Sequence, residues 1–301
     1  MSNVVWFRQD LRLADNPALV HAAAKGPVIG LYVLDDTAPP DGRPLGGAAR
    51  WWLHQSLQEL RSALGGLVLL RGDPRELVPE FARRVNADGV YWNRRYDPES
   101  IACDTAVKAL LKEDGLPAES FNGSLLFEPW QIKTQTGGPY KVFTAFWRAC
   151  LRETMQQAVP APPFQIANVA DAGQALEDWD LLPTKHNWAS GFEAAWQPGE
   201  TGAQQRLQAF LDAGLSGYQT LRDRPDKANV SRLSPHLRFG EVSPRQVWAA
   251  AMHHGLEHPD RQGDVDKFVA EIGWREFSYH LLYHFPELPR RNLNPAFDAY
   301  P

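Results

Sequence analysis

Short apolar runs that alternate with amphipathic segments dominate the first part of this 301-residue chain. Four runs are candidate strands, over residues 4–7, 28–35, 67–72 and 89–93. Two of them are almost continuously apolar, which is typical of strands covered on both faces. Residues 48–64 and 74–85 between them have helical periodicity, and Asp73 before Pro74 is a favourable helix start. The alternation predicts an α/β fold, a doubly wound parallel sheet of Rossmann-like type.

The second part of the chain has a different pattern. Periodicity fades over residues 156–190, which are rich in Ala, Pro and Asp, as in an interdomain connector. Beyond it, helical patterns cover residues 204–213, 247–254 and 264–284. Ser234 and Ser243 each precede a proline, and both are predicted to cap a helix. We therefore predict an α/β domain over residues 1–130, a connector over 131–191 and part of an all-helical domain over 192–301.

Composition excludes several classes of protein. Two cysteines, Cys103 and Cys150, cannot form a disulfide framework or a cysteine metal cluster. No apolar run is long enough to cross a bilayer, and the N-terminus lacks the features of a signal peptide, so we expect a cytosolic protein. A net charge of −5 argues against a surface coated with positive charge. Residues 216–247 nevertheless hold six basic and three acidic residues, which fits either a local basic groove or a solvated face.

The segment after the first predicted strand holds Asp10, Arg12 and Asp15. Open α/β sheets bind ligands at this end of their strands. A polar loop that leads into a helix capped by Asn16 explains the same residues without a ligand, and we favour it.

A candidate anion site lies between residues 231 and 234. Ser231 and Ser234 flank Arg232 just before a predicted helix. Hydroxyl groups, free backbone N–H groups and a guanidinium suit a phosphate or pyrophosphate. An ordinary helix cap beside a surface arginine accounts equally well for this pattern.

The segment from Phe268 to Ser278 places unusual side chains on one helical face. Glu271, Trp274, Arg275 and Ser278 follow helical spacing, and Phe268 lies one turn earlier. An indole stacks on flat rings, a carboxylate accepts hydrogen bonds from their N–H groups, and an arginine binds neighbouring phosphate. A nucleobase is such a ligand, although a structural Glu–Arg pair beneath a tryptophan is a common alternative.

Four blocks together resemble the photolyase/cryptochrome family over essentially the whole chain, and in particular its bacterial class I deoxyribodipyrimidine photolyases. They are "VVWFRQDLRLADNPAL", the "GYxxxRDxP" pattern at 217–225, "SRLSPHLRFGEVSPRQVW" and "EIGWREF". The resemblance implies an antenna-binding α/β domain and a helical domain that binds FAD. It also implies light-driven splitting of cyclobutane pyrimidine dimers in UV-damaged DNA by electron transfer from reduced FAD.

The resemblance also implies roles for individual residues. Tyr218 and Phe268 match flavin contacts, as does the loop of Val230, Ser231, Arg232, Leu233 and Ser234 around the FAD phosphates. Glu271 and Trp274 match the pair that binds the flipped dimer, and Arg222, Arg275 and Ser278 match the DNA-facing surface. The antenna is either a methenyltetrahydrofolate or an 8-hydroxy-deazaflavin, and a monomeric protein is expected.

The family's helical domain is longer than the part present before Pro301. We therefore expect the 301 residues by themselves to bind FAD weakly and to repair DNA inefficiently. Two other functions are compatible with the resemblance: a cryptochrome-like blue-light photoreceptor, and a non-catalytic remnant that binds only an antenna.

Overall fold

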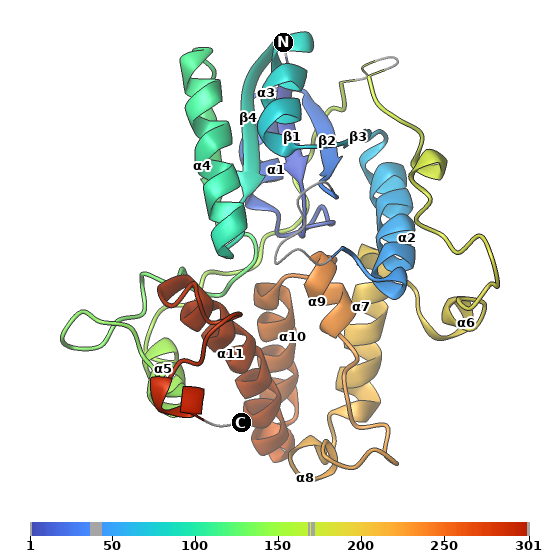
Figure 1. The fold of residues 1–301 in the computed structure, drawn as a ribbon. Coiled ribbons are helices and arrows are strands. Elements are labelled where there is room, and N and C mark those ends of the chain that lie inside the picture. The colour runs from blue at the N-terminus through green and yellow to red at the C-terminus, as the bar shows by residue number, and fades with distance from the viewer. Residues whose placement is uncertain (1, 37–43, 168, 170–171, 300–301) are drawn as a thin grey trace.

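The computed structural model describes residues 2–36, 44–167, 169 and 172–299 (Figure 1). The strands are β1 (Ser2–Phe7), β2 (Val28–Leu34), β3 (Val68–Arg71), β4 (Ala87–Asn93) and β5 (Ala118–Phe121). They form one parallel sheet in the order β3-β2-β1-β4-β5. The α/β prediction is confirmed, with β5 as an additional edge strand.

Helices cover both faces of this sheet. They are α1 (Pro17–Lys25), α2 (Gly47–Leu64), α3 (Pro74–Arg84) and α4 (Pro98–Glu113). Alternate side chains of β1 enter different cores: Val5 and Phe7 join the cluster that includes α1 and α2, whereas Val4 and Trp6 join the one that includes α3 and α4. Both faces are therefore buried, as the continuous apolar runs predicted.

The lower half of the molecule in Figure 1 is helical. Its helices are α5 (Phe143–Cys150), α6 (Phe192–Ala195), α7 (Glu200–Ala209), α8 (Tyr218–Leu221), α9 (Ser234–Phe239), α10 (Pro244–Glu257) and α11 (Gln262–His284). A π-helical turn, η3 (Phe210–Gly214), extends α7. The long helical pattern near the end of the chain is thus confirmed as α11.

The segment between the two halves contributes to both cores. Phe146 and Trp147 of α5 pack in the helical cluster, whereas Leu176 and Trp179 pack in a cluster of the α/β half. The division into residues 1–130, 131–191 and 192–301 stays a prediction. Among the described residues, no helix has the length and apolar content that crossing a membrane requires.

Predicted helix caps are confirmed at three positions and wrong at one. Asn16 accepts from the backbone N–H of Leu19, Asp73 accepts from that of Arg75, and Ser243 forms a complete capping box with Gln246. Ser234 is the exception, because α9 begins at Ser234 itself and Leu233 occupies the cap position without a side-chain hydrogen bond. The proline after Ser234 therefore lies one position further into the helix than predicted.

Candidate flavin and nucleic-acid site

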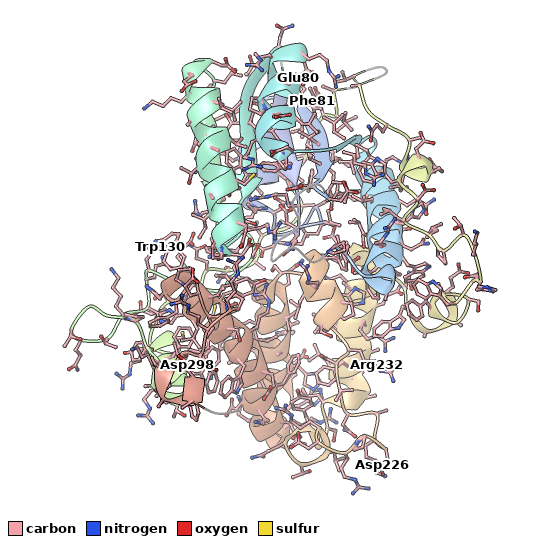
Figure 2. The ribbon with its side chains drawn as sticks, in the orientation of Figure 1. Glu80, Phe81, Trp130, Asp226, Arg232 and Asp298 are labelled. Atoms are coloured by element: carbon pink, nitrogen blue, oxygen red, sulfur yellow. The ribbon has the colours of Figure 1, made fainter. Side chains whose placement is uncertain are left out.

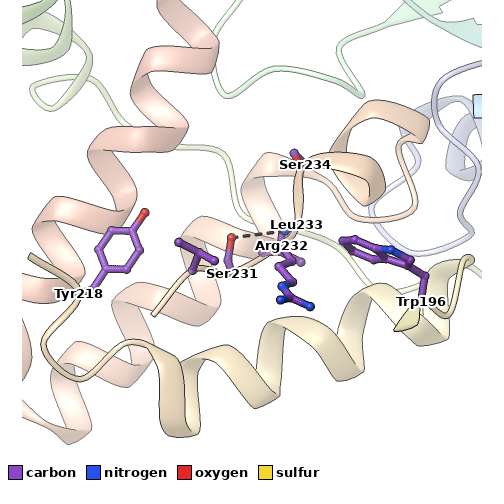
Figure 3. Close-up of a pocket in the computed structure, with 7 residues that line it drawn as sticks. Trp196, Tyr218, Ser231, Arg232, Leu233 and Ser234 are labelled. Atoms are coloured by element: carbon purple, nitrogen blue, oxygen red, sulfur yellow. Dashed lines mark hydrogen bonds between the residues drawn. The ribbon is translucent and has the colours of Figure 1, made fainter. Parts of the chain in front are cut away.

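The loop before α9 forms one wall of an open pocket of about 590 Å³. Arg232 has a backbone φ of 54°, in the left-handed region that non-glycine residues seldom occupy. Ser231 accepts a hydrogen bond from the backbone N–H of Leu233 over 3.4 Å. Figure 3 shows Tyr218 at one end of the pocket and Trp196 at the other, with the loop residues between them. The structure thus brings together Tyr218 and all five predicted loop residues.

One buried carboxylate fixes the two sides of this pocket. Glu241 is fully buried and lies 2.5 Å from Nδ1 of His236 on α9. The same carboxylate accepts from the backbone N–H of Gly199 over 2.8 Å and from the indole N–H of Trp52 over 2.9 Å. Gly199 lies three residues after Trp196. Glu241 therefore connects the segment of residues 196–199 to α9 and α2 through hydrogen bonds.

A stripe on α11 presents Glu271, Trp274 and Ser278 to the surface. Trp274 is 45% exposed, although its neighbours Ile272, Gly273 and Glu276 on α11 are buried. Phe143 of α5 stacks on one face of the indole, with ring centroids 3.8 Å apart and planes 9° apart. One face of Trp274 is therefore covered by protein, and the other is available for a flat ligand.

Glu271 is held by two cations. Its carboxylate pairs with Arg222 at the end of α8 and lies 3.3 Å from Nζ of Lys267. The hydrogen bond to Glu271 raises the pKa of Arg222. Arg222 also lies 5.7 Å from the centroid of the Tyr218 ring, so it lies between the pocket and the α11 stripe.

Two predicted residues are turned away from the stripe. Arg275 donates to the carbonyl of Ser124 over 2.8 Å and contacts Glu276, so it joins α11 to the α/β half. Phe268 is only 2% exposed and packs against Tyr218 with ring centroids 5.6 Å apart. Phe268 thus supports Tyr218 from behind, and neither Glu271 nor Trp274 is among the described residues that line the pocket.

The polar segment after β1 forms internal contacts, as the polar-loop interpretation predicted. Arg12 donates to the carbonyls of Ala14, Asp15, Gly123 and Gly240 over 2.6 to 3.0 Å. Asp15 lies 2.9 Å from Nε of Arg245 on α10, with both side chains almost fully buried. These side chains join the two halves of the molecule.

Comparison with known proteins identifies the family. The family profile described as DNA photolyase matches residues 3–163, more than half of the chain. The chain belongs to the DNA photolyase family. Membership implies a flavin cofactor.

Individual photolyase-family relatives match nearly the whole chain. The deoxyribodipyrimidine photo-lyase of Agrobacterium fabrum is 47% identical over 99% of this chain and 62% of its own length. Cryptochrome-1 of Arabidopsis thaliana is 34% identical over 97% of this chain and 44% of its own. The crystal structure of a bacterial class III photolyase from Agrobacterium tumefaciens superposes with a TM-score of 0.91 and 45% identity, covering 100% of this chain and 62% of that one. The chain thus spans about 62% of the length of its first photolyase relatives, and its subclass stays a prediction.

The donor set of the pocket fits a flavin dinucleotide. Hydroxyl groups of Ser231 and Ser234 and the guanidinium of Arg232 suit a pyrophosphate, and the rings of Tyr218 and Trp196 suit the aromatic ends of such a ligand. Burial raises the pKa of Tyr218 further above neutral pH, so its hydroxyl remains a hydrogen-bond donor over an even wider pH range than an ordinary tyrosine.

Sequence reasoning missed three residues of the site. Trp196 and Glu241 lie within recognisable polar and aromatic segments, but nothing local shows that Trp196 lines the pocket or that Glu241 accepts a hydrogen bond from Gly199. Phe143 lies far from Trp274 in the chain, so its stacking contact has no sequence signal.

Proposed function

We propose that this chain acts in light-driven repair of UV-damaged DNA, recognising cyclobutane pyrimidine dimers beside bound FAD. The observation that carries the proposal is the half-covered indole of Trp274 next to the carboxylate of Glu271 on one exposed face of α11. When bound, reduced FAD supplies the photoexcited electron donor that splits the dimer.

The residues of the chain supply recognition and positioning. Phe143 fixes the plane of Trp274, so its open face stacks on an extruded pyrimidine pair at little entropic cost. Arg222 and Lys267 fix the carboxylate of Glu271, which accepts hydrogen bonds from pyrimidine N–H groups. Flipping a nucleotide costs a few kcal/mol, and a poorly stacked damaged pair costs less, which favours damaged sites.

Tyr218 and residues 230–234 would hold the FAD, with Arg232 and the two serines toward its phosphates. The proposal includes a light-harvesting chromophore in the α/β half, either a methenyltetrahydrofolate or an 8-hydroxy-deazaflavin. Absorption spectra and mass spectrometry of extracted chromophores distinguish these two and also report FAD.

Binding in the dark tests dimer recognition separately from light chemistry. We expect wild-type protein to prefer an oligonucleotide with one thymine dimer over the undamaged oligonucleotide. Trp274→Ala removes the stacking surface and should weaken dimer binding by about 1–3 kcal/mol, as measured by fluorescence anisotropy. Trp188→Ala is the matched control, because Trp188 is 49% exposed and lies in the connector.

Equal binding of damaged and undamaged DNA by wild-type protein would refute dimer recognition. With a flavin spectrum retained, that result would favour the photoreceptor function suggested by the cryptochrome relative. Loss of dimers under blue light in the presence of chemically reduced flavin would support repair. The rate of this loss should be lower in Glu271→Gln than in wild type.

A further inference from the structure

The one-turn helix α8 (Tyr218–Leu221) joins two parts of the site. Tyr218 lines the pocket that fits a flavin dinucleotide (the flavin pocket), and Arg222, directly after the helix, pairs with Glu271 of α11. A helix of one turn is not stable by itself. The cap position of α8 is occupied by Gly217, which has a backbone φ of 76° and no side chain to accept from the first N–H groups. Other segments must therefore hold the start of α8 in place.

Asp264, in the first turn of α11, supplies the missing cap. One of its carboxylate oxygens accepts from the backbone N–H of Gly217 and the other from that of Gln219, each over 2.8 Å. The N–H groups at the start of a helix have no partner within the helix, and hydrogen bonds to a carboxylate are stronger than those between neutral groups. Because Arg222 pairs with Glu271 at the other end, α8 is bound to α11 at both ends.

Asn229 binds the turn that leads into α8 from the opposite side. Its side-chain amide donates to the carbonyls of Gly214 and Ser216 over 3.0 and 2.8 Å. Asn229 directly precedes Val230, the first of the five consecutive residues that line the flavin pocket. This amide therefore fixes the loop at one wall of the pocket relative to the turn that carries Tyr218.

The ring of Tyr218 can keep its place only if α8 keeps its own. It lies between Phe210 of η3 and Phe268 of α11, with ring centroids 5.5 and 5.6 Å away and ring planes at 80° and 85°. Tyr218 is only 6% exposed. These rings belong to the helical end of the molecule, which Figure 2 marks with Asp226 and Arg232. A shift of α8 would displace Tyr218 from this slot and change the wall of the flavin pocket.

We propose that Asp264 and Asn229 are positioning residues of the flavin site, which hold α8 so that Tyr218 meets the bound flavin. The proposal rests on the proposed function for the identity of that ligand. Within the described part of the chain, neither Asp264 nor Asn229 is among the residues that line the flavin pocket. Both therefore act on the ligand through α8 and the loop, without contacting it.

The test measures the FAD affinity of the 301-residue chain by quenching of flavin fluorescence. Asp264→Ala removes both acceptor oxygens, whereas Asp264→Asn keeps the shape of the side chain and one acceptor. Asp266→Ala is the matched control, because it removes a carboxylate from the same helix, one that accepts from the side chain of Gln262 over 2.7 Å. Each substitution is made in the wild type and in Tyr218→Ala, and circular dichroism confirms folding.

We expect Asp264→Ala to weaken FAD binding about ten-fold, and Asp264→Asn about three-fold, because hydrogen bonds to a charged group are lost. Asn229→Ala loses neutral hydrogen bonds and should weaken FAD binding about five-fold. Asp266→Ala should bind FAD like wild type. In Tyr218→Ala, the Asp264 substitutions should cause no further loss, because the carboxylate acts through that ring.

A loss by the same factor with and without Tyr218 would overturn the proposal, since Asp264 would then support only the general stability of the fold. Wild-type affinity in Asp264→Ala or in Asn229→Ala would overturn the role of the residue concerned. Failure of this inference alone leaves FAD binding by wild type intact. No FAD binding by wild type would refute the flavin site itself, and with it both the proposed function and the role of Asp264.

Discussion

Two buried titratable residues on α11 have opposite pKa shifts. Burial raises the pKa of Glu276 to about 7, although Arg275 and the backbone N–H groups of Leu126 and Phe127 stabilise its charged form. Burial lowers the pKa of His280 to about 4, with a further decrease from neighbouring His284. Both groups are therefore neutral in the folded protein at mildly acidic pH.

The two shifts predict a compensated pH dependence of stability. Between the ordinary pKa values of 4.5 and 6.5, the unfolded chain protonates His280 and ionises Glu276, whereas the folded chain does the reverse. The proton counts are equal, so the two contributions to the slope cancel. In Glu276→Gln only the contribution of His280 remains. The free energy of unfolding should then rise with pH by about 1.4 kcal/mol per pH unit relative to wild type.

His280→Gln should give the opposite change, because Glu276 then takes up a proton on folding and stability falls as pH rises. Urea denaturation at several pH values between 4.5 and 6.5 measures both slopes. Parallel pH profiles for wild type and both variants would contradict the pKa assignments.

At the scale of elements, the contact between α5 and α11 requires a glycine, which has no side chain, at position 273. A Cβ atom on Gly273 would lie 2.5 Å from Cε3 of Trp147, whereas one on Gly263 of the same helix would approach only the flexible end of Gln219, at 3.2 Å. Gly273→Ala should destabilise the protein by about 1–3 kcal/mol through overpacking. Gly263→Ala should be neutral or stabilise it by up to about 1 kcal/mol through helix propensity. Thermal unfolding of both variants measures the difference, and equal effects would show that α5 moves aside freely.

Ser243 and Ser234 form a second matched pair. Ser243 accepts from the backbone N–H of Gln246 over 3.0 Å, whereas Ser234 makes no capping bond. Ser243→Ala should cost about 1 kcal/mol in the free energy of unfolding, and Ser234→Ala should change it by less than about 0.5 kcal/mol. A comparable cost for Ser234→Ala would show that Ser234 caps α9, as the sequence predicted.

These elements show which features could be predicted from sequence. Apolar runs revealed β1 to β4, of which β1, β2 and β4 are buried almost throughout, whereas β5 is a short edge strand without a buried side chain and includes exposed Glu119. The loop from Val230 to Ser234 could be predicted because its members are consecutive. Contacts between distant segments, such as Phe143 with Trp274 or Glu241 with Gly199, depend on helix packing that periodicity does not encode.

At the scale of the whole molecule, a buried ion pair fixes the position of the α/β half relative to the helical half. The Asp15–Arg245 pair is 1% and 3% exposed, whereas the surface pair of Arg83 with Asp114 is 57% and 26% exposed. Asp15→Asn leaves a buried guanidinium without its counter-charge and should destabilise the protein by about 3–5 kcal/mol. Asp114→Asn should cost about 1 kcal/mol or less.

Urea denaturation followed by circular dichroism and by tryptophan fluorescence measures both effects. We expect the two probes to separate in Asp15→Asn, because the halves then unfold independently. Coincident transitions at wild-type stability would show that Asp15 does not couple them.

The four carbonyls bound by Arg12 have a consequence for biosynthesis. Two of them belong to Gly123 and Gly240, so this guanidinium, near the start of the chain, obtains its last acceptor only after residue 240 has been synthesised. Domains that emerge first generally fold first. Until then, the N–H group of Arg12 that binds the Gly240 carbonyl has only water as a partner, and the α/β half reaches its final form when the helices arrive.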